Sequence, residues 1–336
     1  MDVGVLLFAP PGQAPALAQL IEGLGFWGLG FPDSQNLLPE AWGQLMLAAA
    51  ASSRVVLGPT VTNSVTRDAA VTASAALALQ AESGGRAFVG IGRGDSAVQR
   101  IGRREDPVAS FERYLTMVQA YLAGEAVDRD GFASRLEWRS HVSVEKPPVM
   151  VAGTGRRVVE VAARRADWVC LAVGADAEHV GAVLAHAREA ARVAGRDVRA
   201  TRWGAFVNCV VYDDLRVARE AVRGSAASFA RFSALPGSRI ADLPAPLAEA
   251  ARWLREHYDM REHTRTGVAH TAGIADDFVD WFAIAGSAAN ARERLLRLAA
   301  LGLDFVWVVP GSTGMPREVG AASVRSLATE VLPALR

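Results

Sequence analysis

A short stretch of the chain, Val89–Val98 (VGIGRGDSAV), has three glycines at two-residue spacing followed by an acidic and a hydroxyl side chain. Glycine lets a backbone approach a ligand closely, so Gly92, Gly94, Asp95 and Ser96 are candidates for a loop that holds a ligand through backbone N–H groups. A glycine run alone is weak evidence for a nucleotide site. Asp95 could also cap the helix that follows, and the two roles are compatible.

Three of the six histidines, His257, His263 and His270, fall close together. Their spacings of six and seven residues do not place all three on one helical face, and no cysteine or carboxylate cluster accompanies them, so no metal site is predicted. His263, with Tyr258, is instead the candidate for proton transfer, titrating near the ordinary histidine pKa of about 6.5. The alternative is a solvated helical segment with incidental histidines. If a helix continued, His263 and His270 would share a face, although Gly267 could break it.

A regular alternation of apolar and amphipathic segments positions these candidates. Eight apolar runs are predicted as strands, at 3–8, 27–31, 54–62, 86–92, 147–153, 166–173, 202–212 and 304–311. Helices are predicted at 13–25, 39–51, 67–83, 107–124, 156–165, 176–195, 214–232, 287–302 and 316–335. Strands that are apolar on both faces belong in a parallel sheet covered by helices. Eight such units predict an α/β fold, a closed (β/α)8 TIM barrel, rather than an open doubly wound sheet.

Two segments interrupt the alternation within what is predicted to be one barrel domain, residues 1–336. Residues 125–146 carry Asp-Arg-Asp-Gly between β-prone runs, a pattern typical of a surface hairpin. Residues 233–285 follow the seventh strand–helix unit and contain His263. Insertions of this size often cover an active site, so this one is predicted to be a helical lid.

The composition excludes several classes of function. The chain has 336 residues, 51% hydrophobic and 21% charged, with a formal net charge of +0. It is therefore expected to be globular, without the basic surface that binds nucleic acid or an anionic membrane. Cys170 and Cys209 lie in apolar runs and predict buried thiols in a reducing compartment. With neither a signal-peptide pattern nor a membrane-spanning apolar run, the protein is expected to be cytoplasmic.

In a barrel of this type, the loops that follow the strands form the functional face. Besides the glycine-rich stretch, four of them combine Gly or Pro with small hydroxyl or amide side chains: 31–36 (FPDSQN), 58–67 (GPTVTNSVTR), 151–157 (VAGTGRR) and 308–314 (VVPGSTG). Turn chemistry alone explains any single loop of this kind. Five of them on one rim favour a ligand site.

Several motifs resemble those of the bacterial-luciferase-like superfamily. They are VTNSVTRDAA, AESGGRAFVGIGRGDSAVQRIGR, DDFVDWFAIAGSAANARERLLRLAALGLDFVWV and PDSQN, and they are most similar to the branch of methylenetetrahydromethanopterin reductase. Members of this superfamily are (β/α)8 barrels that bind FMN or the deazaflavin coenzyme F-420. The resemblance implies an oxidoreductase that transfers hydride between coenzyme F-420 and a small organic substrate. The alternatives are an FMN-dependent monooxygenase and a non-catalytic flavin-binding barrel, and the extended lid argues against the second.

The resemblance also implies where the cofactor ring would lie. In similar proteins the ring crosses the barrel mouth, backed by the chain after the third strand, often through a non-prolyl cis peptide bond. Here that bond would be Thr60–Val61. Asp33 and Asn63 would reach the polar edge of the ring, and Asp33 is also a candidate catalytic group. Several deazaflavin enzymes carry Asp-His after the second strand, whereas this chain has Asp33–Ser34, so no histidine is expected there.

The remaining site residues follow from the same resemblance. The glycine-rich loop would hold the cofactor side chain through backbone amides and Ser96. A helix start would bind its phosphate with free N–H groups and the positive helix end. The residues at that helix start are Gly153, Thr154, Gly155 and Arg156. The YDxxEH pattern that ends at His263 is similar to relatives at this place. Gln35, Trp42 and His270 would line the substrate pocket, and Trp42 is equally consistent with a core position.

Two of the predicted helices are unusually apolar. They contain the runs QLMLAAAA and AAVTASAALALQA, neither of which has a charged residue. A helix that is apolar nearly all round is normally buried on more than its core side. Similar proteins dimerise through this region, so a homodimer is expected.

Overall fold

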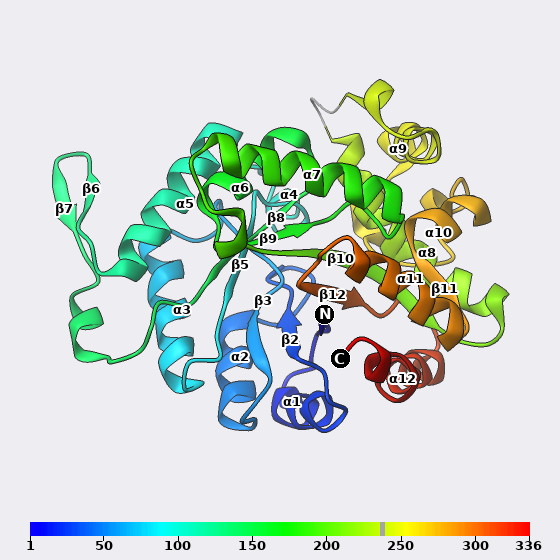
Figure 1. The fold of residues 1–336 in the computed structure, drawn as a ribbon, viewed down its shortest axis with the longest axis horizontal. Coiled ribbons are helices and arrows are strands. Elements are labelled where there is room, and N and C mark those ends of the chain that lie inside the picture. Colours follow the sequence, from blue (N-terminus) through cyan, green and yellow to red (C-terminus); the bar gives the residue numbers. More distant parts are fainter. Residues whose placement is uncertain (236–238) are drawn as a thin grey trace.

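The computed structural model describes residues 1–235 and 239–336. Within these residues, eight parallel strands form a barrel ringed by helices (Figure 1). The strands are β1 (Asp2–Leu6), β2 (Gly28–Phe31), β3 (Val56–Pro59), β5 (Val89–Gly92), β8 (Val149–Gly153), β9 (Trp168–Leu171), β10 (Arg202–Val211) and β12 (Phe305–Val309). They pair from β3 through β2, β1, β12, β10, β9 and β8 to β5. A bridge from Leu57 to Ala87 joins β3 to the start of β5 and closes the ring.

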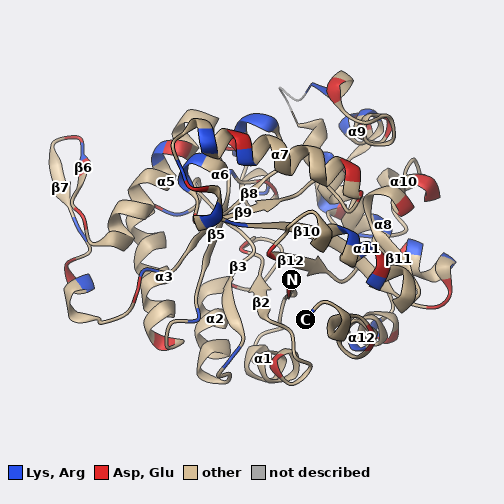
Figure 2. Ribbon diagram, viewed as in Figure 1, with Lys and Arg blue, Asp and Glu red and all other residues tan. Residues whose placement is uncertain are grey.

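The helices cover the outside of the barrel. They are α1 (Ala14–Gly23), α2 (Ala41–Ala50), α3 (Ala69–Glu82), α5 (Val108–Ala123), α6 (Arg156–Arg165), α7 (Ala177–Val193), α8 (Leu215–Ala230), α11 (Ala288–Ala300) and α12 (Arg317–Ser326). Of these helices, α6, α7 and α11 carry several charged residues, whereas α2 carries none (Figure 2). Asp68, Asp176 and Asp214 cap α3, α7 and α8 by accepting a first-turn N–H bond. The predicted (β/α)8 barrel is therefore confirmed.

Three elements differ from the prediction. The predicted strand 54–62 is divided at the Thr60–Val61 peptide bond, which is cis as expected, into β3 and β4 (Thr62–Asn63). A further strand, β11 (Ile284–Gly286), pairs with β10. No pattern predicts β11, because three residues are too few to show a period. The predicted helix 316–335 is regular only to Ser326 and ends in a π-helical turn and a 3-10 turn.

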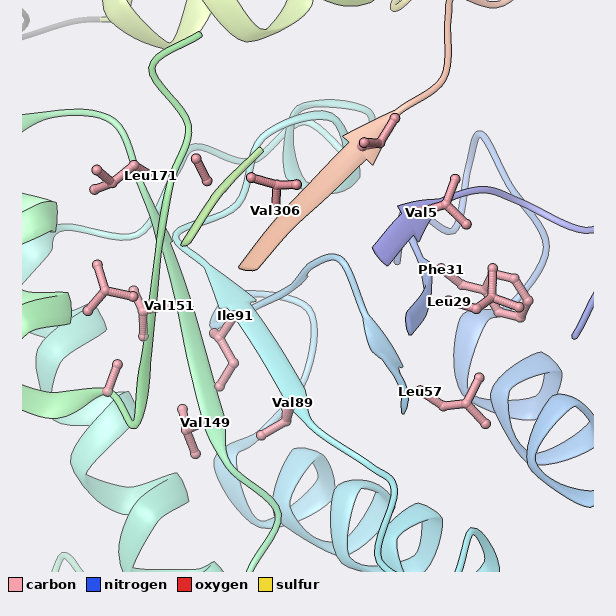
Figure 3. Close-up of a cluster of buried hydrophobic side chains, with 14 of the residues drawn as sticks. Val5, Leu29, Phe31, Leu57, Val89, Ile91, Val149, Val151, Leu171 and Val306 are labelled. Atoms are coloured by element: carbon pink, nitrogen blue, oxygen red, sulfur yellow. The ribbon is translucent and has the colours of Figure 1, made fainter. Parts of the chain in front are cut away.

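The apolar strands contribute to two layers of core. Outward-pointing side chains pack against the helices, and Figure 3 shows part of this layer around Val5, Leu57 and Val151. A second cluster lies inside the barrel, and its fully buried members include Phe88, Phe305 and Trp307. Strands with both faces buried explain why the sequence runs are continuously apolar instead of alternating.

Glycines in the strands make room for the aromatic filling of the barrel. A Cβ on Gly4 would lie 2.4 Å from the ring of Trp307, and a Cβ on Gly28 would lie 2.6 Å from the same ring. A Cβ on Gly204 would lie 2.3 Å from the ring of Phe305. Glycine is normally unfavourable within a strand, but here it permits the close approach of a neighbouring side chain.

Arg202 closes the N-terminal end of the barrel. Its guanidinium lies 5.0 Å, 5.1 Å and 5.5 Å from the ring centroids of Trp27, Trp168 and Phe305. It also donates to the carboxylate of Asp2 at 2.6 Å. Arg202 and Asp2 are the first residues of their strands, so this contact lies at the N-terminal end of the barrel. In barrels of this type, residues at that end contribute to stability and not to the active site. The opposite rim carries the predicted site.

The two interrupting segments have distinct structures. Residues 125–146 contain the antiparallel strands β6 (Val127–Arg129) and β7 (Phe132–Ser134), which project from the barrel (Figure 1). In the predicted lid, residues 236–238 lie outside the described residues. The rest forms α9 (Ala245–His257), α10 (Asp276–Phe282), β11 and short 3-10 turns. No helix in the described part of the chain is long and apolar enough to cross a membrane.

Candidate active site

Hydrogen bonds join the loops that follow β2 and β5 at the rim of the barrel. Ser34 Oγ lies 2.9 Å from Ser96 Oγ, and Gln35 Nε2 donates to the carbonyl oxygen of Ala97 at 2.7 Å. These bonds hold the glycine-rich loop against the loop that carries Asp33. Thr62 and Arg67 of a third predicted loop, 58–67, also bond to Asp33, so the structure brings together three of the five predicted loops.

Asp33 is buried and engaged by two donors. Its Oδ2 accepts hydrogen bonds from Thr62 Oγ1 at 2.7 Å and from Arg67 Nε at 3.2 Å. Only 7% of Asp33 is exposed. Charge-assisted bonds of this kind are strong, so the carboxylate is suited to fixing the loops and accepting a further bond through its other oxygen.

The chain after β3 presents two buried polar atoms that have no partner among the described residues. Asn63 Oδ1 accepts two backbone N–H bonds from the following turn at 3.0 Å and 2.9 Å, whereas its Nδ2 is unpaired. Thr60 Oγ1 is also unpaired. Val61 lies against β5, where a Cβ on Gly92 would be 3.1 Å from it. A buried, unpaired amide donor fits an acceptor on the polar edge of a flavin-type ring.

The glycine-rich loop makes a turn that requires glycine. Gly94 has φ of +97°, and a Cβ there would lie 2.4 Å from Val98. Asp95 precedes the short helix α4 (Ser96–Gln99), but its side chain makes no capping hydrogen bond. It forms an ion pair with Arg231, which follows α8. The structure therefore does not support the capping role considered for Asp95.

An uncapped helix start follows β8. Thr154 Oγ1 donates to the carbonyl oxygen of Ala172 at 3.1 Å, and Gly155 precedes α6 with no side chain capping the helix. A Cβ on Gly155 would meet nothing within 4 Å. Arg156 is exposed and pairs with Glu160 at 3.2 Å. The first turn of α6 thus combines free N–H groups, open space and positive charge, which suits an anion.

Residues 258–270, here called the roof segment, contact two parts of the rim. Arg100, next to α4, donates to the carbonyl oxygens of Met260 and Arg261 at 2.7 Å and 3.0 Å. The hydroxyls of Thr264 and Thr313 lie 2.7 Å apart and tie the segment to the loop after β12. The segment contains 3-10 turns instead of a continuous helix, and Gly267 between them has φ of +69°. His263 and His270 therefore do not share a helical face.

Tyr258 and His263 form a partly buried, hydrogen-bonded pair in the roof segment. The Tyr258 hydroxyl lies 2.5 Å from His263 Nδ1 and 2.8 Å from Ser228 Oγ. Burial lowers the pKa of His263 to about 3, and the nearby cations Arg231 and Arg100 contribute to the decrease. Burial raises the pKa of Tyr258. Both side chains are neutral near pH 7, so the expected titration of His263 near its ordinary pKa is wrong.

The three predicted pocket residues have different environments. His270 is 1% exposed, has no partner for either ring nitrogen among the described residues, and lies 4.4 Å from the Tyr258 ring between centroids. Burial lowers its pKa. Trp42 is 5% exposed and belongs to the layer between barrel and helices, which is the core position considered for it. Gln35 is exposed at the rim.

Three polar residues at this end of the barrel are not indicated by any motif. Asn208 in β10 is 0% exposed, and neither atom of its amide has a partner among the described residues. An asparagine within the apolar run RWGAFVNCVVY is a signal that could have found it. Ser228 and Arg231 lie in an ordinary amphipathic pattern, which gives no such signal.

Two surface clefts lie outside these residues. A cleft of about 860 Å³ opens between the first turns of α7, α8 and α11, and one of about 410 Å³ lies beside α5. Neither is lined by a predicted site residue. Cys170 and Cys209 are buried and free. Residues 1–235 and 239–336 contain no group of His, Cys, Asp or Glu that could hold a metal ion.

Comparison with known proteins defines the family. The profile of the luciferase-like monooxygenase family matches residues 3–304, so the chain belongs to this family. It is 25% identical over 300 residues to the 5,10-methylenetetrahydromethanopterin reductase of Methanolobus tindarius, covering 86% of this chain and 87% of the relative. It is 26% identical over 310 residues to the reductase of that name from Archaeoglobus fulgidus, covering 88% of each.

Solved structures agree with this placement. The fold matches that of the coenzyme F-420 dependent tetrahydromethanopterin reductase of Methanopyrus kandleri with a TM-score of 0.77, at 21% identity over 100% of this chain and 99% of that one. It matches a monooxygenase from Streptomyces bottropensis with a TM-score of 0.69, at 23% identity over 100% of both chains. The protein is an enzyme of the oxidoreductase class.

Proposed function

We propose that the protein transfers hydride between the deazaflavin coenzyme F-420 and a small organic substrate. The observation that carries the proposal is the buried, unpaired donor of Asn63 at the mouth of this barrel. The two methylenetetrahydromethanopterin reductases, at 25% and 26% identity, support it. A fold match to an F-420-dependent secondary alcohol dehydrogenase, with a TM-score of 0.76, supports the same cofactor.

The residues at the mouth fit a deazaflavin. Such a cofactor, when bound, supplies hydride chemistry at its ring, and the protein supplies orientation and protons. Asn63 Nδ2 and Thr60 Oγ1 would meet the polar edge of the ring, and Asp33 would accept a bond from it. Amides of the glycine-rich loop would hold the side chain. The open first turn of α6, at Gly155, would bind a phosphate.

Tyr258 and His263 would handle the proton that accompanies the hydride. They lie on the roof segment. Arg100, which follows the glycine-rich loop, donates hydrogen bonds to this segment. Because both side chains are neutral near pH 7, they would work through hydrogen bonds instead of a resident charge.

An FMN-dependent monooxygenase is the second candidate function. The description of the matching family and the fold match to a monooxygenase, with a TM-score of 0.69, favour it. The two candidates differ in the cofactor that binds and in whether oxygen is consumed during turnover.

Titration of the purified protein with coenzyme F-420 and, separately, with FMN distinguishes the two. We expect the deazaflavin to bind more tightly, as followed by its fluorescence, and the reduced complex to leave dissolved oxygen unchanged. Tighter binding of FMN, with oxygen uptake by the reduced complex, would identify the monooxygenase instead.

We also propose that the protein forms a homodimer through α2 and α3. Leu47 and Val71, on these helices, are each 52% exposed. The two helices together, Ala41–Ala50 and Ala69–Glu82, contain one charged residue, Glu82. A second copy of the same apolar face is the partner that this surface fits, because Glu82 is the one charge that the two helices offer to an unlike partner.

A further inference from the structure

Ser228 stands at a junction of hydrogen bonds beneath the roof segment. It lies near the end of α8 and is 1% exposed. Its Oγ donates to the carbonyl oxygen of Gly224 at 3.0 Å and accepts from the backbone N–H of Thr264 at 3.0 Å. The hydroxyl oxygen of Tyr258 lies 2.8 Å away. One serine hydroxyl thus connects α8 to the pair formed by Tyr258 and His263.

The number of hydrogens at this junction determines the tautomer of His263. A serine hydroxyl has one hydrogen and two lone pairs. The bond to Gly224 uses that hydrogen, so Tyr258 must donate its own hydrogen to Ser228. His263 Nδ1, 2.5 Å from the Tyr258 oxygen, must then carry a hydrogen and donate it. In a neutral imidazole, Nε2 is left as an acceptor.

The reverse arrangement makes one hydrogen bond fewer. If Ser228 turned its hydrogen toward Tyr258, then Tyr258 would donate to Nδ1 and Nε2 would carry the hydrogen. The bond from Ser228 to Gly224 would be lost, while the bond from Thr264 would remain. The Ser228 hydroxyl and the Gly224 carbonyl group are both buried in α8. A buried carbonyl oxygen that loses one of its hydrogen bonds lowers the stability of the folded protein. The tautomer with hydrogen on Nδ1 is therefore favoured.

Neighbouring charges keep the imidazole from taking a second proton. The groups that face His263 are Arg231 after α8, Arg100 beside α4, and His270 and Tyr258 of the roof segment. Arg231 is ion-paired to Asp95, and its guanidinium carbon lies 4.7 Å from the centroid of the Tyr258 ring. Two cations close to a partly buried imidazole disfavour the imidazolium form.

Nε2 is the free end of this chain of hydrogen bonds. It has no partner among the described residues, and it is not one of the fully buried unpaired atoms. We propose that Ser228 is a positioning residue that presents Nε2 of His263 as a hydrogen-bond acceptor, so that the substrate meets it with a hydroxyl or N–H group. The reaction at this site is the one given under the proposed function, on which the inference rests. The substrate class is then a molecule with a hydroxyl or N–H group.

The tautomer can be measured directly by 15N NMR of protein labelled at histidine, without cofactor, at pH 7. The signals of His263 are those that disappear in His263→Gln. We expect Nδ1 to resonate as a protonated ring nitrogen and Nε2 as an unprotonated one. The opposite order in the wild-type protein would overturn the inference, whatever any variant shows.

Two serine variants isolate the role of Ser228. In Ser228→Ala, the Tyr258 hydroxyl has only Nδ1 to donate to, so we expect the order of the two 15N signals to reverse. Ser225→Ala is the matched control, since Ser225 lies in α8, is 1% exposed and donates to the carbonyl oxygen of Val222 at 2.9 Å. Its His263 signals should match the wild type. An unchanged order in Ser228→Ala, with the other histidine signals intact, would show that Ser228 does not set the tautomer.

Cyclohexanol and cyclohexanone test the substrate class on the same NMR signal. We expect the alcohol to shift Nε2 saturably and the ketone to leave it unchanged, because only the alcohol donates a hydrogen bond. A shift by the ketone alone, or by neither compound, would overturn the assignment of the substrate group. The cofactor titration reports on the proposed function separately. A protein that fails to bind coenzyme F-420 but has hydrogen on Nδ1 contradicts that function and leaves the tautomer in place.

Discussion

The imidazole of His263 takes up a proton only well below neutral pH, since burial is the main cause that lowers its pKa to about 3. In the unfolded chain a histidine has a pKa of about 6.5. Between these two values the unfolded state binds more protons than the folded state. The free energy of unfolding therefore falls as the pH falls through this window, by up to about 1.4 kcal/mol per pH unit from this residue.

We expect His263→Gln to weaken this pH dependence, because glutamine takes up no proton on unfolding. Urea unfolding at pH 7, 6 and 5 measures the slope. His141, which is exposed, provides the control, and His141→Gln should keep the wild-type slope. A slope in His263→Gln equal to that of the wild type would show that the imidazole is not held neutral in the folded protein.

Gly155 offers a test of the anion site at α6. A side chain there meets open space in the protein, so Gly155→Val should fold normally and obstruct the ligand. We expect the affinity for coenzyme F-420 to fall by about tenfold or more, equivalent to at least about 1.4 kcal/mol. Gly23→Val is the matched control, because Gly23 also has nothing within 4 Å and lies at the end of α1. Equal affinities in both variants would place the phosphate elsewhere.

Some of these residues can be predicted from the sequence, and others cannot. Asp33 and Asp95 lie in loops shortly after strands, and Asn63 ends the two-residue strand β4, so local turn chemistry and motifs are visible at all three. Ser228 gives no signal, because its partners Thr264 and Tyr258 are more than 25 residues away along the chain. Their meeting depends on the path of the roof segment, which tertiary contacts determine.

Among the elements, β10 shows how closely the barrel is filled. A Cβ on Gly204 would lie 2.3 Å from the Phe305 ring, which is fully buried and cannot move aside. We expect Gly204→Ala to lower the free energy of unfolding by about 1–3 kcal/mol through overpacking. Gly23→Ala adds a methyl group in open space within a helix and should be neutral or stabilising by up to about 1 kcal/mol. Urea unfolding compares them, and equal stability would indicate a looser interior.

The eight barrel strands are predictable because each lies in a continuous apolar run, and their helices are predictable because each is long enough to show its period. The break between β3 and β4 and the three-residue β11 are not predictable in this way. β11 pairs with the outer end of β10, at Cys209, and exists only because α8 and α10 bring it there. Short elements of this kind depend on contacts between distant segments rather than on local pattern.

At the scale of the whole molecule, the apolar face of α2 and α3 predicts a dimer. Leu47→Glu combined with Val71→Glu places two charges on this face and should yield a folded monomer. Leu296→Glu on α11, where Leu296 is 42% exposed, is the control and should leave the mass unchanged. Light scattering at micromolar concentration measures the mass. A wild-type protein that is already monomeric would contradict the proposed dimer.

The packing of the barrel interior has a consequence for the order of events in a catalytic cycle. Trp307 and its aromatic neighbours fill the interior, and Arg202 covers its N-terminal end, so among the described residues the mouth is the passage that remains. If the planar cofactor lies on this aromatic layer, as we propose, it has to bind before the smaller molecule above it. The product has to depart before the cofactor can exchange. Steady-state kinetics should therefore show an ordered mechanism, in which the cofactor binds first and dissociates last.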